Sequence, residues 1–132
     1  MQEKKLVHTK EFAIRWGDMD AYGHLNNINY FFYTQEARFE MLKDLNIEFD
    51  IHGVAPILLN TSFNFKKQVV WPETLLVETW LLNIDRKKIY FEHIIKSATQ
   101  SDVIYGVSDA LVMWYDFNSK TTVLPPEIEK IL

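Results

Sequence analysis

The sequence contains no cysteine, and this absence excludes three kinds of chemistry. Disulfide bonds, thiolate zinc sites and cysteine nucleophiles all require a thiol group. No apolar run approaches the roughly 20 residues that cross a bilayer, and the polar start MQEKK lacks the apolar core of a signal peptide. We therefore expect a cytoplasmic protein without a membrane partner.

Basic residues are also few relative to acidic ones. The chain has 14 Lys and Arg residues against 18 Asp and Glu residues, for a net charge of −4. Proteins that bind nucleic acids usually carry a surplus of basic residues on one face, so we expect no nucleic-acid partner. At 132 residues, 48% of them apolar, the chain can bury a sizeable core, and we expect one domain over residues 1–132.

The spacing of apolar residues predicts one long helix and five strands. Period-two alternation predicts a first strand over residues 6–16, and helical spacing predicts a helix from Asn27 to about Lys43. Pro125-Pro126 opens a short closing helix. Four further segments are rich in β-branched and aromatic residues and are separated by short polar turns, as antiparallel strands are: residues 57–70, 74–84, 88–98 and 103–117.

The predicted long helix is apolar around most of its girth. Such a helix needs a curling sheet or a partner chain to cover its additional apolar face. We therefore predict an α+β fold in which a bent, antiparallel five-stranded sheet wraps a central helix, and we expect a homodimer or homotetramer. The main apolar stripe is Ile28, Phe31, Phe32, Phe39 and Leu42, widened by Tyr30, Tyr33, Ala37 and Met41.

Polar residues concentrate directly before this helix, in the segment RWGDMDAYGHLNNINY over residues 15–30. Asp, Gly and Asn favour turns and helix caps, so the segment should be a loop that ends at the helix start. In a purely structural interpretation, Asn26 or Asn27 caps the helix, Gly23 takes a positive φ, and Asp18 bonds to nearby backbone.

Two residues of the loop are not explained by this structural role. Asp20 and His24 flank a helix start, whose free N–H groups can stabilise an oxyanion, and this combination suggests acyl transfer. An EF-hand calcium loop does not fit, because Tyr22 stands at position five, which needs an oxygen ligand, and Asn29 stands at position twelve, which needs a bidentate Glu. Asp18, Asp20 and His24 lack a second cluster to complete a transition-metal site, so we expect no metal and no cofactor.

The loop and helix together carry the motif Asp18-x-Asp20-x-x-Gly23-His24-Leu25-Asn26-Asn27-x-x-Tyr30, followed by Glu36-Ala37-Arg38. This motif resembles that of hotdog-fold acyl-CoA thioesterases of the 4-hydroxybenzoyl-CoA thioesterase type. The resemblance covers nearly the whole chain and implies a hotdog fold. It also implies an acyl-CoA or acyl-carrier-protein substrate, without identifying the acyl group.

The resemblance further implies roles for residues of the loop. Asp20 is the catalytic carboxylate, acting as nucleophile or general base, and a main-chain N–H at Asn27 or a neighbour polarises the thioester carbonyl. An alkyl thiol has a pKa of about 8.5, so the thiolate leaves without a dedicated general acid. His24 and Asn27 orient the water or the acyl group, and Tyr30 lines the pocket. A plain loop histidine is the alternative for His24.

The phosphates of CoA require a local cluster of cations in an acidic protein. Arg86-Lys87-Lys88 is the best such cluster, and the resemblance implies that basic residues at this turn meet the nucleotide, often across a subunit interface. A solvated hairpin turn is the alternative interpretation. Lys66-Lys67 is a second candidate.

The sequence thus predicts an acyl-CoA thioester hydrolase that releases a carboxylic acid and a free thiol. The alternative is a non-catalytic module that binds acyl-CoA or acyl carrier protein, and the presence of Asp20 argues against it. A hydratase on the same fold would need a different acid/base pair, which the sequence does not show.

Overall fold

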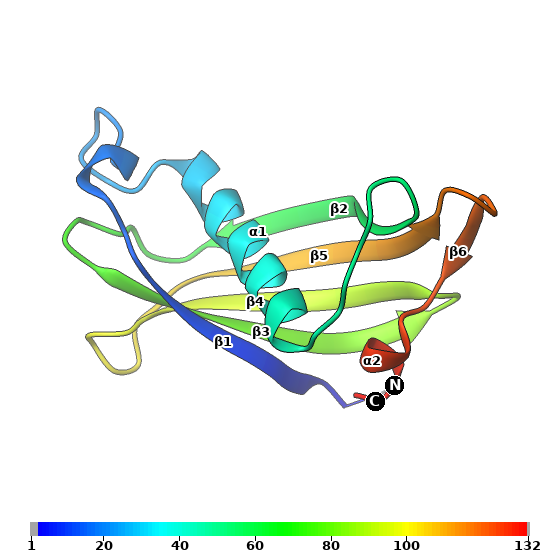
Figure 1. Cartoon of the computed structure of the whole chain (residues 1–132). Helices are drawn as coiled ribbons and strands as arrows, with labels where there is room; N and C mark the ends of the chain where they lie inside the picture. The colour runs from blue at the N-terminus through cyan, green and yellow to red at the C-terminus, as the bar shows by residue number, and fades with distance from the viewer. Residues whose placement is uncertain (1–2, 132) are drawn as a thin grey trace.

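The structure is a computed structural model that describes residues 3–131. One long helix lies across a six-stranded sheet, and two short helices flank these elements (Figure 1). The strands are β1 (Lys5–Ala13), β2 (Val54–Phe65), β3 (Thr74–Asp85), β4 (Lys88–Ser97), β5 (Ile104–Asp116) and β6 (Thr121–Val123). The helices are the 3-10 helix η1 (Trp16–Asp18), α1 (Asn27–Asp44) and α2 (Pro126–Glu129).

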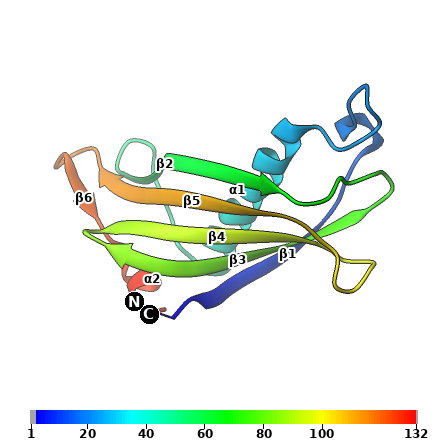
Figure 2. The ribbon, with the colours of Figure 1, turned by 180° about the vertical axis from the view of Figure 1, so that it is seen from behind.

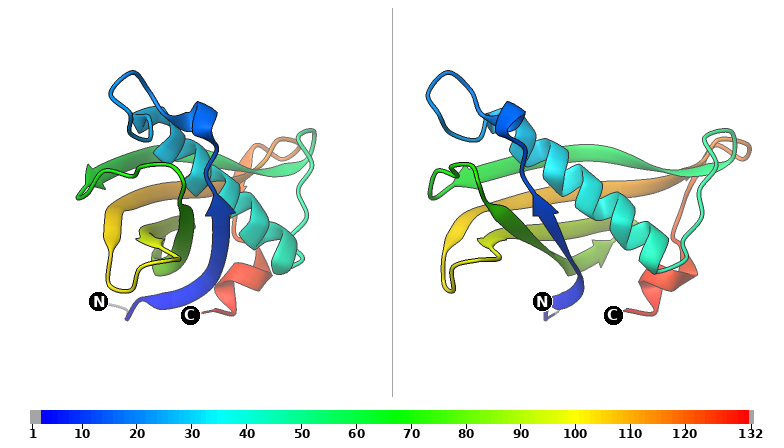
Figure 3. Two further views of the ribbon diagram at one scale, coloured as in Figure 1. Left: turned by 90° about the vertical axis from the view of Figure 1, so that its left-hand side faces the viewer. Right: turned by 60° about the vertical axis from the view of Figure 1, so that its left-hand side comes forward.

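The sheet has the strand order β1-β3-β4-β5-β2, and β6 pairs with β5. Every strand pairing is antiparallel. Viewed from behind, the strands lie in front and α1 lies behind them (Figure 2), and a side view shows the sheet curling around α1 (Figure 3). The predicted hotdog arrangement of a bent antiparallel sheet around a central helix is therefore confirmed.

The core lies between α1 and the concave face of the sheet. Alternate residues of β3 and β4 point toward α1 and are buried, as expected for strands with one covered face. The buried apolar side chains form two clusters, one around Tyr33 in the first half of α1 and one around Met41 in its second half. Between the clusters, the buried faces of the central strands carry polar residues, namely Thr79, His93 and Ser108.

The buried stripe of α1 differs from the predicted one. Tyr30, Tyr33, Ala37 and Met41, which we expected only to widen the stripe, are its buried centre. Of the predicted main stripe only Leu42 is buried, whereas the others are exposed by 37 to 72%: Ile28, Phe31, Phe32 and Phe39. The helix has apolar residues on both sides, so the sequence pattern alone did not identify which side faces the sheet.

The sheet also has one strand more than predicted. β6 pairs with residues 114–116 of β5, after a turn that follows Asp116. β2 begins three residues before the predicted start and ends at Phe65 rather than at residue 70. It ends there because the Lys66 and Lys67 N–H groups both donate to the Tyr105 carbonyl oxygen, which stops the regular ladder. Within the described chain, no helix is long and apolar enough to cross a membrane.

A buried carboxylate fixes the end of the sheet where β1 and β3 meet. Glu73 accepts hydrogen bonds from the Thr74 N–H at 2.8 Å, from Thr99 Oγ1 at 2.7 Å and from Ser97 Oγ at 2.9 Å. It also accepts one from the Tyr105 hydroxyl. Burial alone would raise the pKa of Glu73, but these hydrogen bonds outweigh it and hold the pKa below the ordinary value of 4.5.

Replacing Glu73 by Gln should destabilise the fold. The amide turns one acceptor into a donor that faces other donors, so we expect the free energy of unfolding to fall by about 2 kcal/mol at pH 7. Because the pKa is lowered on folding, the difference from the wild type should shrink as the pH falls below 4.5. Urea unfolding at pH 7 and pH 3 measures both effects, and an equal difference at the two pH values would contradict this assignment.

Candidate active site

The loop before α1 is held in place by main-chain hydrogen bonds. The Asp20 N–H donates to the His24 carbonyl oxygen at 2.9 Å, and the Gly23 N–H donates to the Asp20 carbonyl oxygen at 3.0 Å. Gly23 has a φ of 79°, as predicted, which a residue without a Cβ adopts at no steric cost. The Leu25 N–H reaches the Val69 carbonyl oxygen at 2.8 Å and joins the loop to the segment after β2.

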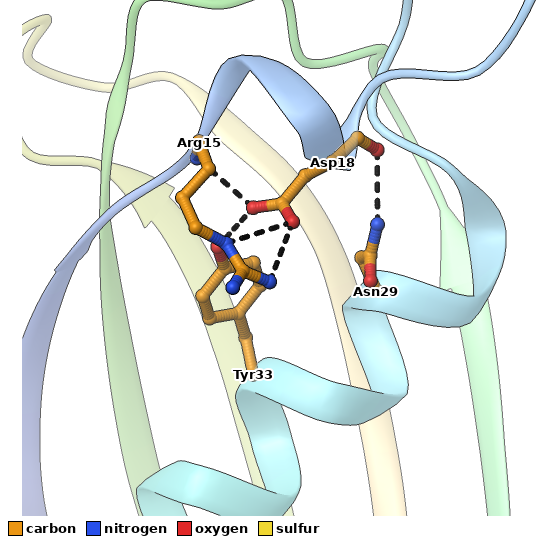
Figure 4. A network of polar contacts seen from close by, with 4 residues as sticks. All are labelled: Arg15, Asp18, Asn29 and Tyr33. Carbon is orange, nitrogen blue, oxygen red and sulfur yellow. Dashed lines mark hydrogen bonds and ion pairs between the residues drawn. The ribbon is translucent and has the colours of Figure 1, made fainter.

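Asp18 is the centre of a buried polar network at the base of this loop (Figure 4). Its carboxylate accepts from the Arg15 main-chain N–H at 2.9 Å and from Arg15 Nε and Nη2 at 3.1 and 2.8 Å. The Tyr33 hydroxyl on α1 donates to the same carboxylate. Burial opposes the charged form, but the bonds from Tyr33 and Arg15 outweigh it and lower the pKa of Asp18 below 3.8.

The main-chain oxygen of Asp18 fixes the start of the helix. It accepts the Asn26 N–H at 3.0 Å. It also accepts the Asn29 side-chain amide at 2.9 Å, a bond drawn in Figure 4. Asn29 was not among the predicted site residues, because in the sequence it stands out only at a position where a calcium loop needs Glu. An amide side chain in the first turn of a helix, facing the preceding loop, is the signal that could have suggested this bond.

Asn26 is the N-cap of α1. Its side-chain oxygen accepts the Ile28 N–H at 3.3 Å, and its carbonyl oxygen accepts the Asn29 N–H at 2.9 Å. Of the two predicted caps, Asn26 is therefore the one observed, and Asn27 is the first helical residue. Among the described residues, the Asn27 N–H has no acceptor, so it is free to bind an oxygen of a ligand.

A cavity of about 470 Å³, here called the Asp20 pocket, opens at this helix start. Asp20, His24, Asn27 and Tyr30, which the sequence analysis selected, all line it. Asp20 is half-buried, and its Oδ1 accepts the Tyr22 N–H at 2.9 Å. Within residues 3–131, its other carboxylate oxygen has no hydrogen-bond partner and is available for chemistry.

Tyr30 lines the Asp20 pocket and is almost completely buried. The side chain is only 3% exposed, and burial raises its pKa above the ordinary value. Its ring packs edge-on against Phe63 and Phe65 of β2, with centroid distances of 5.3 and 5.0 Å. Tyr30 therefore fixes the first turn of α1 against the sheet.

The two predicted basic clusters lie in different places. Lys66 and Lys67 line the Asp20 pocket. Residues 86 and 87 form the two-residue turn between β3 and β4, with φ values of 53° and 65°, and Lys88 pairs with Asp85 beside it. The loop that carries Asp20 follows the end of β1, and Ala13 at that end pairs with Thr74 at the start of β3. Residues 86–88 lie after the other end of β3, so within one chain they do not meet Asp20.

The groups around the Asp20 pocket do not form a metal site. Across residues 3–131, no three His, Asp or Glu side chains come together in a way that could hold a metal ion. The arrangement instead combines one accessible carboxylate, one free N–H at a helix N-terminus and two lysines around one cavity. It can place a carbonyl oxygen at the positive end of a helix beside a nucleophile or base.

Comparison with known proteins finds thioesterases among the relatives of this chain. The sequence profile of the thioesterase-like superfamily matches residues 14–132. The long-chain acyl-CoA thioesterase FadM of Escherichia coli (strain K12) is 24% identical over 113 residues, which cover 84% of this chain and 83% of FadM.

Two solved structures are similar over most of their length. The PA2801 protein of Pseudomonas aeruginosa has a TM-score of 0.90 and 30% identity, covering 96% of this chain and 98% of its own. The XC229 protein of Xanthomonas campestris has a TM-score of 0.75 and 31% identity, covering 83% and 93%.

Replacing Asp18 by Asn should loosen the loop that carries Asp20. The variant loses the charge-assisted bonds from Arg15 and Tyr33, so we expect the free energy of unfolding to fall by about 2 kcal/mol at pH 7. Asp18 has a lowered pKa when folded, so its contribution is present above pH 3.8 and is lost as the pH falls further.

Chemical denaturation at pH 7 and pH 3 measures this loss. Asp85→Asn removes a carboxylate that is exposed, and it should change the unfolding free energy by no more than about 0.5 kcal/mol. If both variants behave alike, Asp18 does not organise the loop.

Proposed function

The chain belongs to the thioesterase-like superfamily and is a thioester hydrolase, and we propose that it cleaves an acyl-CoA into a carboxylic acid and free CoA thiol. One observation carries the proposal. Asp20, whose carboxylate keeps one oxygen without a partner, and Asn27, whose N–H has no acceptor among the described residues, line the same cavity at the start of α1. Thioester cleavage needs these two groups, because one side chain must supply or activate the nucleophile while a donor stabilises the oxyanion.

The proposed reaction begins with the thioester carbonyl oxygen at the Asn27 N–H. Asp20 then either attacks the carbonyl carbon itself or takes a proton from a water that attacks it. Negative charge develops on the carbonyl oxygen, where the helix N-terminus stabilises it. Collapse of the tetrahedral intermediate breaks the carbon–sulfur bond and releases the thiolate. In the first route, water hydrolyses the resulting anhydride and frees Asp20.

We assign supporting roles to His24 and Tyr30. His24 lines the Asp20 pocket and is half-buried, so its ring can orient the attacking water. Tyr30 is fixed between α1 and β2, where it shapes the wall on which the acyl group rests. The name of FadM makes long-chain acyl-CoA one substrate class to test, and the resemblance to 4-hydroxybenzoyl-CoA thioesterases adds an aromatic class.

We also propose that the protein works as a homodimer. β2 is an edge strand, and its Leu58, Leu59 and Phe65 side chains are 45, 42 and 49% exposed. Phe31 and Phe39 of α1 add further exposed apolar area. An open strand edge with exposed apolar side chains favours pairing with a second copy. Such a dimer would be the source of the basic residues 86–88 for a neighbouring site.

Replacing Asp20 by Ala should abolish most of the turnover. We expect the rate of free-thiol release from acyl-CoAs to fall at least about a hundredfold, because the nucleophile or base is removed. The measurement is a thiol-release assay over long-chain and aromatic acyl-CoAs, with circular dichroism to verify folding.

Asp109→Asn is the matched control, since Asp109 is an exposed carboxylate that does not line the Asp20 pocket. Its turnover should equal that of the wild type. Unchanged turnover in Asp20→Ala would favour the alternative, a module that binds acyl-CoA or acyl carrier protein without cleaving it.

Separate removal of the two basic clusters should show which one binds the CoA phosphates. For the cluster that binds them, replacing two cations by Gln should raise KM for an acyl-CoA about tenfold and leave kcat nearly unchanged. The two variants are Lys66→Gln with Lys67→Gln, and Arg86→Gln with Lys87→Gln.

An N-acetylcysteamine thioester of the same acyl group is the control substrate, because it lacks the nucleotide. Its KM should be the same in the wild type and in both variants. A rise in KM for this substrate, or no rise for the acyl-CoA in either variant, would refute a phosphate-binding role for these clusters.

A further inference from the structure

A second cavity, here called the α1–sheet cavity, lies between the second half of α1 and the sheet. Its volume is about 130 Å³, and none of its lining residues lines the Asp20 pocket. Most of its wall is apolar, with contributions from α1, β2, β4, β5 and α2. Residues that represent this wall are Met41, Phe91, Val112, Trp114 and Ile128.

Arg38 is the cation in the wall of this cavity. Its side chain comes from α1, and Nη1 lies 3.1 Å from Nε2 of His93. His93 is completely buried on β4, and its other ring nitrogen lies 3.0 Å from Oγ1 of Thr79. Because an arginine can only donate, Nε2 of His93 is the acceptor, and Nδ1 carries the hydrogen that is donated to Thr79.

The partner of Arg38 is therefore a neutral group. Burial and the nearby Arg38 charge lower the pKa of His93 to about 3, so the ring is uncharged at neutral pH. The ion pairs within residues 3–131 do not include Arg38. Burial lowers the pKa of Arg38 to about 10, which still leaves the guanidinium charged. Arg38 is only partly exposed, and a partly desolvated charge is stabilised by an opposite charge nearby, which the described residues do not supply within ion-pair distance.

The shape and chemistry of the cavity indicate what could supply that charge. A guanidinium binds a carboxylate through two parallel hydrogen bonds. The contact with His93 occupies only one nitrogen of the Arg38 guanidinium, so other N–H donors of Arg38 remain for a carboxylate. A cavity of 150 Å³ in another protein holds one benzene molecule, so the similar volume here admits an apolar body of about six carbons.

We infer that the α1–sheet cavity binds a monocarboxylate whose apolar body has about six carbons, with the carboxylate on the Arg38 guanidinium. The class includes straight-chain and aromatic acids of this size. It matches the chemistry of an acid that thioester cleavage releases, but the binding itself requires no turnover. The inference therefore stands or falls separately from the role of Asp20.

Calorimetric titration of the wild-type chain with hexanoate and hexanol tests the inference without any substitution. The two probes share the apolar body and differ in the carboxylate, so hexanoate should bind at least about tenfold more tightly. Benzoate and benzyl alcohol repeat the comparison for an aromatic body. Equal affinity of acid and alcohol, or no binding of either acid, would overturn the inference.

Two variants of α1 locate the effect. Arg38→Gln should weaken hexanoate binding at least about tenfold and leave hexanol binding unchanged. Lys43→Gln removes one exposed positive charge from the same helix and should leave both affinities unchanged. If Arg38→Gln does not fold, the comparison of acid and alcohol on the wild type decides the question together with the position of the bound acid.

The position of the ligand is read from the Trp114 indole N–H signal in nitrogen-resolved NMR spectra. Trp114 lines the α1–sheet cavity and is only 1% exposed, so hexanoate in this cavity should shift its signal. Shifts that appear at the Leu25 and Asn27 amides and not at Trp114 would place the acid in the Asp20 pocket and overturn the inference.

Discussion

The candidate site depends on the buried carboxylate of Asp18. Its side chain binds Arg15 and Tyr33, and its main-chain oxygen binds Asn26 and Asn29. One residue thereby joins the segment after β1 to the first turns of α1, and these two segments are the ends of the loop. Because the loop has fixed ends, Asp20 and Asn27 are held at the same cavity.

The sequence was sufficient to predict the fold class, the long helix, most strands and the loop residues that meet at one cavity. These features depend on local patterns, namely alternation, turn composition and a dense polar motif. The buried side of α1 was not predicted, because Phe31 and Phe39 are as apolar as the buried Tyr33 and Ala37. The sequence favoured Arg86-Lys87-Lys88 over Lys66-Lys67 as the best local cluster of cations, and only the folded chain shows that Lys66 and Lys67 line the Asp20 pocket.

The core is not a single apolar body. Thr79, His93 and Ser108 lie side by side on three neighbouring strands, and they separate the two apolar clusters along α1. His93 satisfies both ring nitrogens, with Thr79 and with Arg38. A satisfied polar layer of this kind fixes the register of strands against each other, since a slip would leave buried donors without acceptors.

The turn at Arg86 and Lys87 has a thermodynamic consequence. Both residues adopt the left-handed backbone region, which disfavours side chains with a Cβ by roughly 1 kcal/mol or more per residue. Asn-Gly would suit this two-residue hairpin better. The native hairpin is thus less stable than its geometry permits, and a consensus design that optimised it for melting temperature would remove both positive charges at the same time.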